Sequence, residues 1–147
     1  MGMTDHHIFG YQFNTPALLQ QALTHRSFIN EQRQSCHQDY QRLEFLGDAV
    51  LGMILADVLF SNFPGFSEGR LSQMRASLVD QPRLAALAKE TGLPELVLLG
   101  RGAELEGGRA YASILSDVFE ATIGAIYLDG GFQAAYQVVC TLYTPLH

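Results

Sequence analysis

The feature that most constrains the fold is a pair of long apolar segments, each carrying two acidic residues at helical spacing. In QRLEFLGDAVL, residues 41–51, Glu44 and Asp48 lie four positions apart within a nearly continuous hydrophobic run. In SILSDVFEATI, residues 113–123, Asp117 and Glu120 lie three positions apart. Side chains three or four positions apart share one face of a helix. We therefore expect helices over about 39–60 and 111–128, each apolar almost everywhere except for one acidic pair.

These acidic pairs predict a metal site. A helix that is apolar on most sides is normally buried, and a buried carboxylate is costly unless it is protonated, hydrogen-bonded, paired or bound to metal. Residues 43–51 and 114–123 contain four acids and no basic residue. Hard oxygen ligands suit Mg²⁺ or Mn²⁺ rather than Zn²⁺, and such an ion can activate water and stabilise charge on a phosphoryl group. On the pattern alone, the acids could also face solvent or cap neighbouring helices.

Start and stop signals predict further helices and an all-α domain. Polar residues at 30–38 and four glycines within 100–109 predict exposed loops. No alternating pattern persists long enough to form a sheet. Neither a repeat nor a linker interrupts the chain, so we expect one domain over 1–147. The remaining helices are expected to begin at Thr15-Pro16, at Ser67, at Asp80 with Pro82 two residues on, and after the Gly130-Gly131 break, at 132–143.

Composition adds limits on location and partners. Nine basic residues against 15 acidic ones give a net charge of −6, which by itself argues against nucleic acid as a partner. A bound metal would offset some of that charge. Cys36 and Cys140 are far apart and form no CxxC motif, which predicts reduced thiols in a cytoplasmic protein. We expect neither a signal peptide at residues 1–7 nor a membrane span.

Four segments together resemble the ribonuclease III family. QRLEFLGDAVL at 41–51 closely resembles the family's signature helix, and SILSDVFEA at 113–121, continuing to GAIYLD at 124–129, resembles its second active-site helix. LTHRS at 23–27 and GRLSQMRA at 69–76 resemble two further family segments. The resemblance runs in the family's order from about residue 9 to residue 132. Motifs of this length are far more specific than an isolated pair of acids.

The resemblance implies a fold, an activity and a set of roles. The chain is expected to adopt the helical fold of the ribonuclease III catalytic domain and to form a homodimer. It is expected to hydrolyse double-stranded RNA, such as precursors of rRNA and mRNA, leaving short 3′ overhangs. Glu44, Asp48, Asp117 and Glu120 match the quartet that holds Mg²⁺, for which Mn²⁺ can substitute. Asp48 and Glu120 match the pair with the central catalytic role, and Phe45 matches an aromatic residue that inserts into the partner subunit.

This sequence departs from the family pattern at a few points. Gln41 and Ala49 stand where the family usually has Glu and Ser. We expect Gln41, at the edge of the acidic cluster, to assist the site more weakly than Glu would, without loss of the metal. Typical bacterial members continue into a double-stranded-RNA-binding domain that residues 1–147 do not contain. A catalytically silent RNA-binding relative is the alternative, although such proteins are expected to lack quartet acids. A di-iron bundle needs Glu-x-x-His motifs, and this sequence has none.

A histidine and three arginines are further candidates for the site. His25 lies in the LTHRS segment, outside the quartet, which favours a structural hydrogen-bonding role. Arg70, Arg75 and Arg109 could contact phosphate groups, and surface ion pairs explain each of them equally well.

Overall fold

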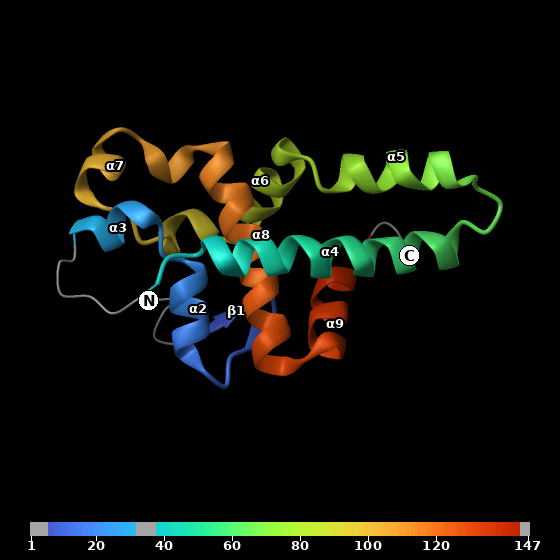
Figure 1. Cartoon of the computed structure of the whole chain (residues 1–147), viewed down its shortest axis with the longest axis horizontal. Coiled ribbons are helices and arrows are strands. Elements are labelled where there is room, and N and C mark those ends of the chain that lie inside the picture. Colours follow the sequence, from blue (N-terminus) through green and yellow to red (C-terminus); the bar gives the residue numbers. More distant parts are fainter. Residues whose placement is uncertain (1–5, 32–37, 145–147) are drawn as a thin grey trace.

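The computed structural model describes residues 6–31 and 38–144, and its elements are almost entirely helical, as the sequence predicted (Figure 1). In chain order the elements are β1 (His7–Ile8), β2 (Tyr11–Gln12), α2 (Pro16–Ala22), α3 (Arg26–Glu31), α4 (Gln41–Asn62), α5 (Glu68–Leu78), α6 (Gln81–Glu90), η1 (Leu93–Leu96), α7 (Arg101–Leu105), η2 (Gly108–Ala110), α8 (Ala112–Gly130) and α9 (Phe132–Leu142).

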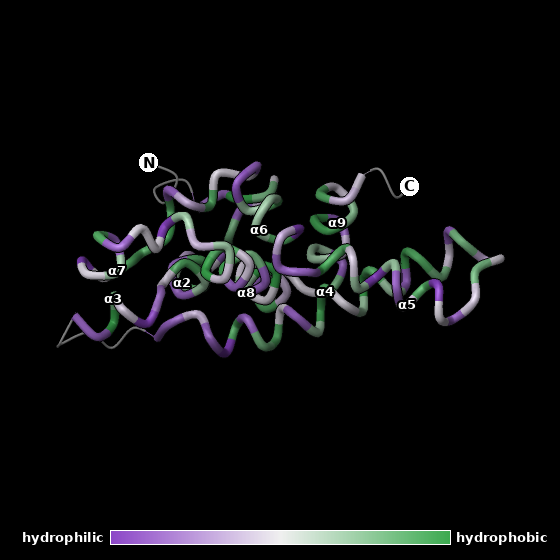
Figure 2. The backbone as a smooth tube through the Cα atoms, turned by 90° about the horizontal axis from the view of Figure 1, so that it is seen from above, coloured by the Kyte–Doolittle hydropathy of each residue, from purple (hydrophilic) through white to green (hydrophobic). Residues whose placement is uncertain are grey.

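Helix α8 is the centre of the domain. It packs against α2, α4, α6 and α9, and Figure 2 looks nearly along its axis, with the other helices around it. Its buried side chains lie on every side of the helix, from Ile114 to Ile126. The near absence of polar residues in this segment follows from that burial, because a helix surrounded by other helices needs an apolar surface all round. Asp117 and Glu120 are the acidic exceptions in this buried stretch, and both are only half-buried.

Two glycines allow α4 to cross α8 at very close range. A Cβ atom on Gly47 would lie 1.7 Å from the carbonyl oxygen of Glu120, and one on Gly124 would lie 2.5 Å from the carbonyl oxygen of Leu43. Real Cβ atoms essentially never approach other atoms this closely, so only glycine fits at either position. The backbones therefore touch at the crossing, where the acidic pairs of the two helices are located.

The predicted helix starts are confirmed, with one difference in chemistry. Ser67 and Asp80 each accept a hydrogen bond from the backbone N–H three residues on, at 3.2 and 2.9 Å. Thr15 occupies the N-cap position of α2, but its side chain makes no capping hydrogen bond. Its backbone N–H instead donates to Asp129, at the other end of the domain's sequence, at 2.8 Å.

Two of the predicted irregular regions contain regular structure. Strands β1 and β2 pair antiparallel, with His7 opposite Gln12, so the expectation of no sheet is wrong for this two-residue ladder. The predicted loop at 100–109 contains α7 and part of η2. Both elements are shorter than a period-based prediction can detect. The predicted loop at 30–38 begins two residues too early, since α3 extends to Glu31; residues 32–37 of that loop, including Cys36, lie outside the described residues.

Helix α4 extends beyond the body of the domain. Its C-terminal half and α5 run side by side away from the other helices (Figure 1). Its outer surface keeps three large apolar side chains in solvent: Phe45, Met53 and Phe60 are 82, 64 and 73% exposed. Within the described residues, no helix combines the length and hydropathy needed to cross a membrane.

Candidate active site

The α4–α8 crossing brings the acidic pairs together. Glu44, Asp117 and Glu120 each place a carboxylate oxygen within 4.8 Å of the others. Asp48 is more exposed and is not part of that tight group, but it lies close enough to Glu120 for the two carboxyls to share a proton. The structure thus gathers all four predicted residues at one place, three closely and Asp48 at the margin.

Burial disfavours ionisation of the carboxyls in this group, and for Glu44 and Glu120 the neighbouring carboxyls add to the effect. Burial, a hydrogen bond with Asp48 and the charge of that residue raise the pKa of Glu120 from 4.5 to about 8. Burial, a hydrogen bond with Asp117 and the charges of Asp117 and Asp48 raise the pKa of Glu44 to about 7. Burial also raises the pKa of Asp117. Carboxylates gathered without a counter-charge behave in this way.

The donor set fits a hard divalent cation. All the candidate ligands are carboxylate oxygens, and no Arg or Lys side chain forms an ion pair with any of them within the described residues. A divalent cation would supply the missing positive charge and so relieve the repulsion that, together with burial, raises the pKa values of Glu44 and Glu120. Oxygen-only ligands favour Mg²⁺ or Mn²⁺ over softer metals.

His25 has the structural role that its position in the sequence predicted. Its Nδ1 atom accepts hydrogen bonds from the backbone N–H of Ser27, at 3.1 Å, and from the hydroxyl of Ser27, at 2.8 Å. Nδ1 therefore carries no proton, and burial lowers the pKa of the imidazole. The network continues through Ser27 Oγ, which also accepts the backbone N–H of Gly100 at 2.8 Å.

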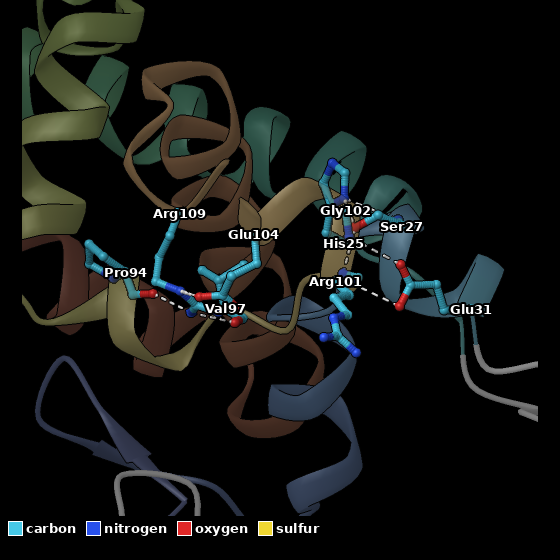
Figure 3. Close-up of polar contacts among 10 residues, drawn as sticks. His25, Ser27, Glu31, Pro94, Val97, Arg101, Gly102, Glu104 and Arg109 are labelled. Carbon is cyan, nitrogen blue, oxygen red and sulfur yellow. Dashed lines mark hydrogen bonds and ion pairs between the residues drawn. The ribbon is translucent and has the colours of Figure 1, made fainter. Parts of the chain in front are cut away.

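The same network explains why α7 forms. The carboxylate of Glu31, at the end of α3, accepts the backbone N–H groups of Arg101 and Gly102 at 2.9 and 3.4 Å (Figure 3). These are unpaired donors in the first turn of α7. The cap comes from a residue 70 positions earlier in the chain. Nothing local to the glycine-rich segment could have indicated it.

The three arginines considered as phosphate contacts differ in the structure. Arg109 donates to both carboxylate oxygens of Glu104 and to the carbonyls of Pro94 and Val97, at 2.7 to 2.8 Å (Figure 3). This arginine therefore joins α7 to η1. Arg70 lies over the ring of Phe66 at 4.1 Å, and Arg75 is exposed on α5. Of the three arginines, only Arg70 and Arg75, both on α5, remain available to contact phosphate.

Gln41 belongs to a polar contact at the start of α4. It is exposed at the first position of α4, and its side-chain oxygen accepts a hydrogen bond from Arg26 at 3.3 Å. Arg26 also pairs with Asp39 at 3.6 Å. These contacts hold the start of α4 against α3.

Sequence reasoning did not identify the role of Asp129, at the end of α8. Its carboxylate accepts hydrogen bonds from the hydroxyl of Tyr11 and from the backbone N–H groups of Asn14 and Thr15, at 2.6, 2.7 and 2.8 Å. Although partial burial opposes it, this set of donors lowers the pKa of Asp129. The residue fastens the β1–β2 hairpin and the start of α2 to α8. In the sequence, this role was indicated only by the position of Asp129 in the GAIYLD segment.

The fold and the site together define an all-α domain with a carboxylate cluster at the crossing of its two longest helices. The model of the Ribonuclease-III-like family matches residues 15–146. The chain belongs to this family.

Curated relatives and solved structures agree with that assignment. The chain is 52% identical to Ribonuclease 3 of Anoxybacillus flavithermus over 128 residues, which are 87% of this chain and 54% of that protein. It is 51% identical to Ribonuclease 3 of Geobacillus kaustophilus over 125 residues, or 85% and 51% of the two chains. The chain thus spans about half the length of the curated relatives it matches.

Among solved structures, the fold resembles the nuclease domain of ribonuclease III from Campylobacter jejuni. The TM-score is 0.86 at 39% identity, covering 93% of this chain and 92% of that one; the description of that structure notes flexibility in a region involved in dimer formation. Dicer from Pichia stipitis resembles it with a TM-score of 0.65 at 27% identity, covering 90% of this chain and 55% of that one.

Proposed function

We propose that this chain is the catalytic domain of a metal-dependent endoribonuclease that cuts double-stranded RNA as a homodimer. The observation that carries the proposal is the convergence of Glu44, Asp117 and Glu120 within 4.8 Å, with Asp48 beside them, at the α4–α8 crossing. Membership of the Ribonuclease-III-like family supports the same reaction. A cytoplasmic location is part of the proposal, because precursors of rRNA and mRNA in bacteria are found there.

The four carboxylates have distinct parts in this proposal. Glu44, Asp117 and Glu120 hold Mg²⁺ or Mn²⁺ on the buried side of the site, and Asp48 completes the set from its exposed rim. The bound ion supplies Lewis acidity, which activates a water and offsets charge on the scissile phosphate. Asp48 and Glu120 form the catalytic pair in this proposal: Asp48 is the most exposed of the four acids, and its carboxyl lies within hydrogen-bonding reach of Glu120.

Helix α4 supports dimerisation through Phe45. This ring is 82% exposed one residue beyond Glu44, beside a hollow of about 560 Å³ whose lining includes Leu43, Leu46 and Leu128. An exposed aromatic next to a hollow that leucine side chains make partly apolar can pack against a second copy of the same face. A two-fold axis through this face would seat the Phe45 of each subunit in the hollow of the other. The pairing would bury side chains that the isolated subunit leaves in water.

The product geometry follows from two sites in one dimer. Each subunit contributes one carboxylate cluster, so two clusters related by a two-fold axis can cut the two strands of a duplex at staggered positions. Short 3′ overhangs are the expected result. Arg70 and Arg75 on α5 are the proposed phosphate contacts, since Arg109 is already engaged by Glu104.

Cleavage of a long RNA duplex tests the activity. The purified chain is incubated at low salt with and without Mg²⁺, beside Glu120→Gln and a matched control, Glu90→Gln, on the exposed surface of α6. We expect Mg²⁺-dependent cutting by the unmodified chain and by Glu90→Gln, and loss of cutting in Glu120→Gln. Binding of the duplex without cutting would instead favour a catalytically silent RNA-binding protein. Equal activity in the two variants would refute the roles assigned to the cluster.

Light scattering tests the dimer. The chain has a mass of 16.2 kDa, so a dimer should measure twice that, 32.4 kDa. Phe45→Ala should shift the protein to monomer at micromolar concentration without loss of helix signal. Leu105→Ala removes an equally exposed side chain, 80% in solvent, from α7 and should leave the dimer unchanged. A monomeric unmodified chain would count against this interface.

A further inference from the structure

Tyr40 connects the two helices that carry the acidic cluster. It is buried, with 5% exposure, at the N-cap of α4. Its backbone N–H donates to the carbonyl of Thr24 at 2.9 Å, and its own carbonyl accepts the N–H of Glu44 at 2.8 Å. The ring packs against His25 with centroids 5.9 Å apart. The backbone of Tyr40 therefore fixes the first turn of α4, from which Glu44 extends.

The side chain of Tyr40 reaches α8. Its hydroxyl donates a hydrogen bond to Oδ2 of Asp117 at 3.5 Å. Within the described residues, this is the one bond that a non-acidic side chain donates to Glu44, Asp48, Asp117 or Glu120. The contact is long for a phenol–carboxylate bond, but the ring that carries the hydroxyl is held by its own burial and by His25. Its direction is therefore set by packing and does not depend on the bond itself.

We propose that Tyr40 is a positioning residue that orients the carboxylate of Asp117 for the divalent cation. This inference rests on the proposed function and adds a member to the site that the quartet alone does not include. Metal-ligating carboxylates are themselves hydrogen-bonded by neighbouring groups, which fix their orientation toward the metal. Tyr40 supplies that donor without adding charge, so it leaves the negative potential that attracts the cation intact. A Lys or Arg at the same place would compete with the metal.

Tyr40→Phe isolates the hydroxyl, because the ring and its packing on His25 remain. The matched control is Tyr11→Phe, which removes a phenol donor to another aspartate of α8, Asp129, bonded at 2.6 Å. The two aspartates are twelve residues apart, which is about 18 Å along a helix. Both variants lose one hydroxyl-to-carboxylate bond, but only one of these bonds reaches the cluster.

Direct titration of Mn²⁺ against the RNA-free protein, followed by the electron paramagnetic resonance signal of the free ion, measures metal affinity without catalysis. We expect Tyr40→Phe to weaken Mn²⁺ binding about tenfold, the lower end of the usual effect of such outer partners, and Tyr11→Phe to leave it unchanged. In cleavage assays, Tyr40→Phe should need correspondingly more Mg²⁺ and recover the unmodified rate at saturating Mg²⁺. A purely structural role for the hydroxyl would not show that rescue.

The outcomes separate this inference from the proposed function. Equal Mn²⁺ affinity in Tyr40→Phe and the unmodified chain, with normal cleavage by the latter, overturns the role of Tyr40 alone. A loss of affinity equal to that of Tyr11→Phe also overturns it. Failure of the unmodified chain to bind Mn²⁺ or to cut duplex RNA overturns both proposals.

Discussion

Gly47→Ala tests whether the close crossing of α4 and α8 holds the site together. The new Cβ atom would start 1.7 Å from the carbonyl oxygen of Glu120 and 2.9 Å from the backbone nitrogen of Gly124. Both obstacles are backbone atoms of a buried helix, so no rotamer change can relieve them. To reach even 3.0 Å from the oxygen, the two helices must separate by about 1.3 Å at this point.

The cost can be worked from that displacement. Adding a methyl group to a well-packed contact costs about 1–3 kcal/mol. A gap of about 1 Å elsewhere along the crossing also forfeits a quarter to a half of the dispersion energy of the atoms it separates. The helix preference for Ala over Gly returns about 0.5–1 kcal/mol. We therefore expect Gly47→Ala to lose about 3 kcal/mol of unfolding free energy, which for a domain of this size lowers Tm by about 6–12 °C.

Urea denaturation followed by circular dichroism measures the effect, with Gly69→Ala as the control. Gly69 lies in the first turn of α5, and a Cβ atom there would meet nothing within 4 Å. Its replacement should leave stability unchanged or raise it by up to about 1 kcal/mol. If Gly47→Ala were as stable as the unmodified chain, α4 and α8 could not cross as described. Mn²⁺ affinity should fall together with stability, because the same separation moves Glu44 away from Asp117.

Three further predictions follow from the charged groups. Because the pKa values of Glu44 and Glu120 are raised, the metal-free folded state keeps protons that the unfolded chain has released, so its unfolding free energy should fall as pH rises from about 5 to 8. Mg²⁺ should remove this pH dependence, and a metal-free unfolding free energy that does not change with pH would contradict the raised pKa values. Asp129→Ala should cost about 2 kcal/mol at pH 7 in urea denaturation, and the difference should shrink at pH 3, because the unmodified carboxylate loses its contribution as pH falls through its lowered pKa; an equal difference at both pH values would refute this. Arg109→Ala should lower the unfolding free energy by about 2 kcal/mol, since it leaves two carbonyls unpaired, whereas Arg75→Ala should change it by less than about 0.5 kcal/mol. Equal losses in the two variants would show that the contacts of Arg109 contribute no more to stability than an exposed arginine does.

Local sequence was enough to predict the two long helices and the acids that they carry. Nearly continuous apolar runs, too long for strands, extend over both long segments, and capping residues such as Ser67 and Asp80 mark where other helices begin. Spacings of three and four fix each acidic pair to one helix face, whatever the helix packs against. These are local properties of the chain, so they could be predicted without coordinates, and the family motifs added which acids to consider together.

That the two acidic faces meet became evident only from the packing of α4 on α8. Their distance depends on the contact of Gly47 with Glu120 across 73 residues of sequence, and a glycine's role in a crossing cannot be seen until the second helix is in place. The same is true of the cap that Glu31 gives α7 and of the hydroxyl that Tyr40 directs at Asp117. Helix formation depends on neighbours within about four residues, whereas a site depends on how whole helices pack, and packing is a property of the entire core.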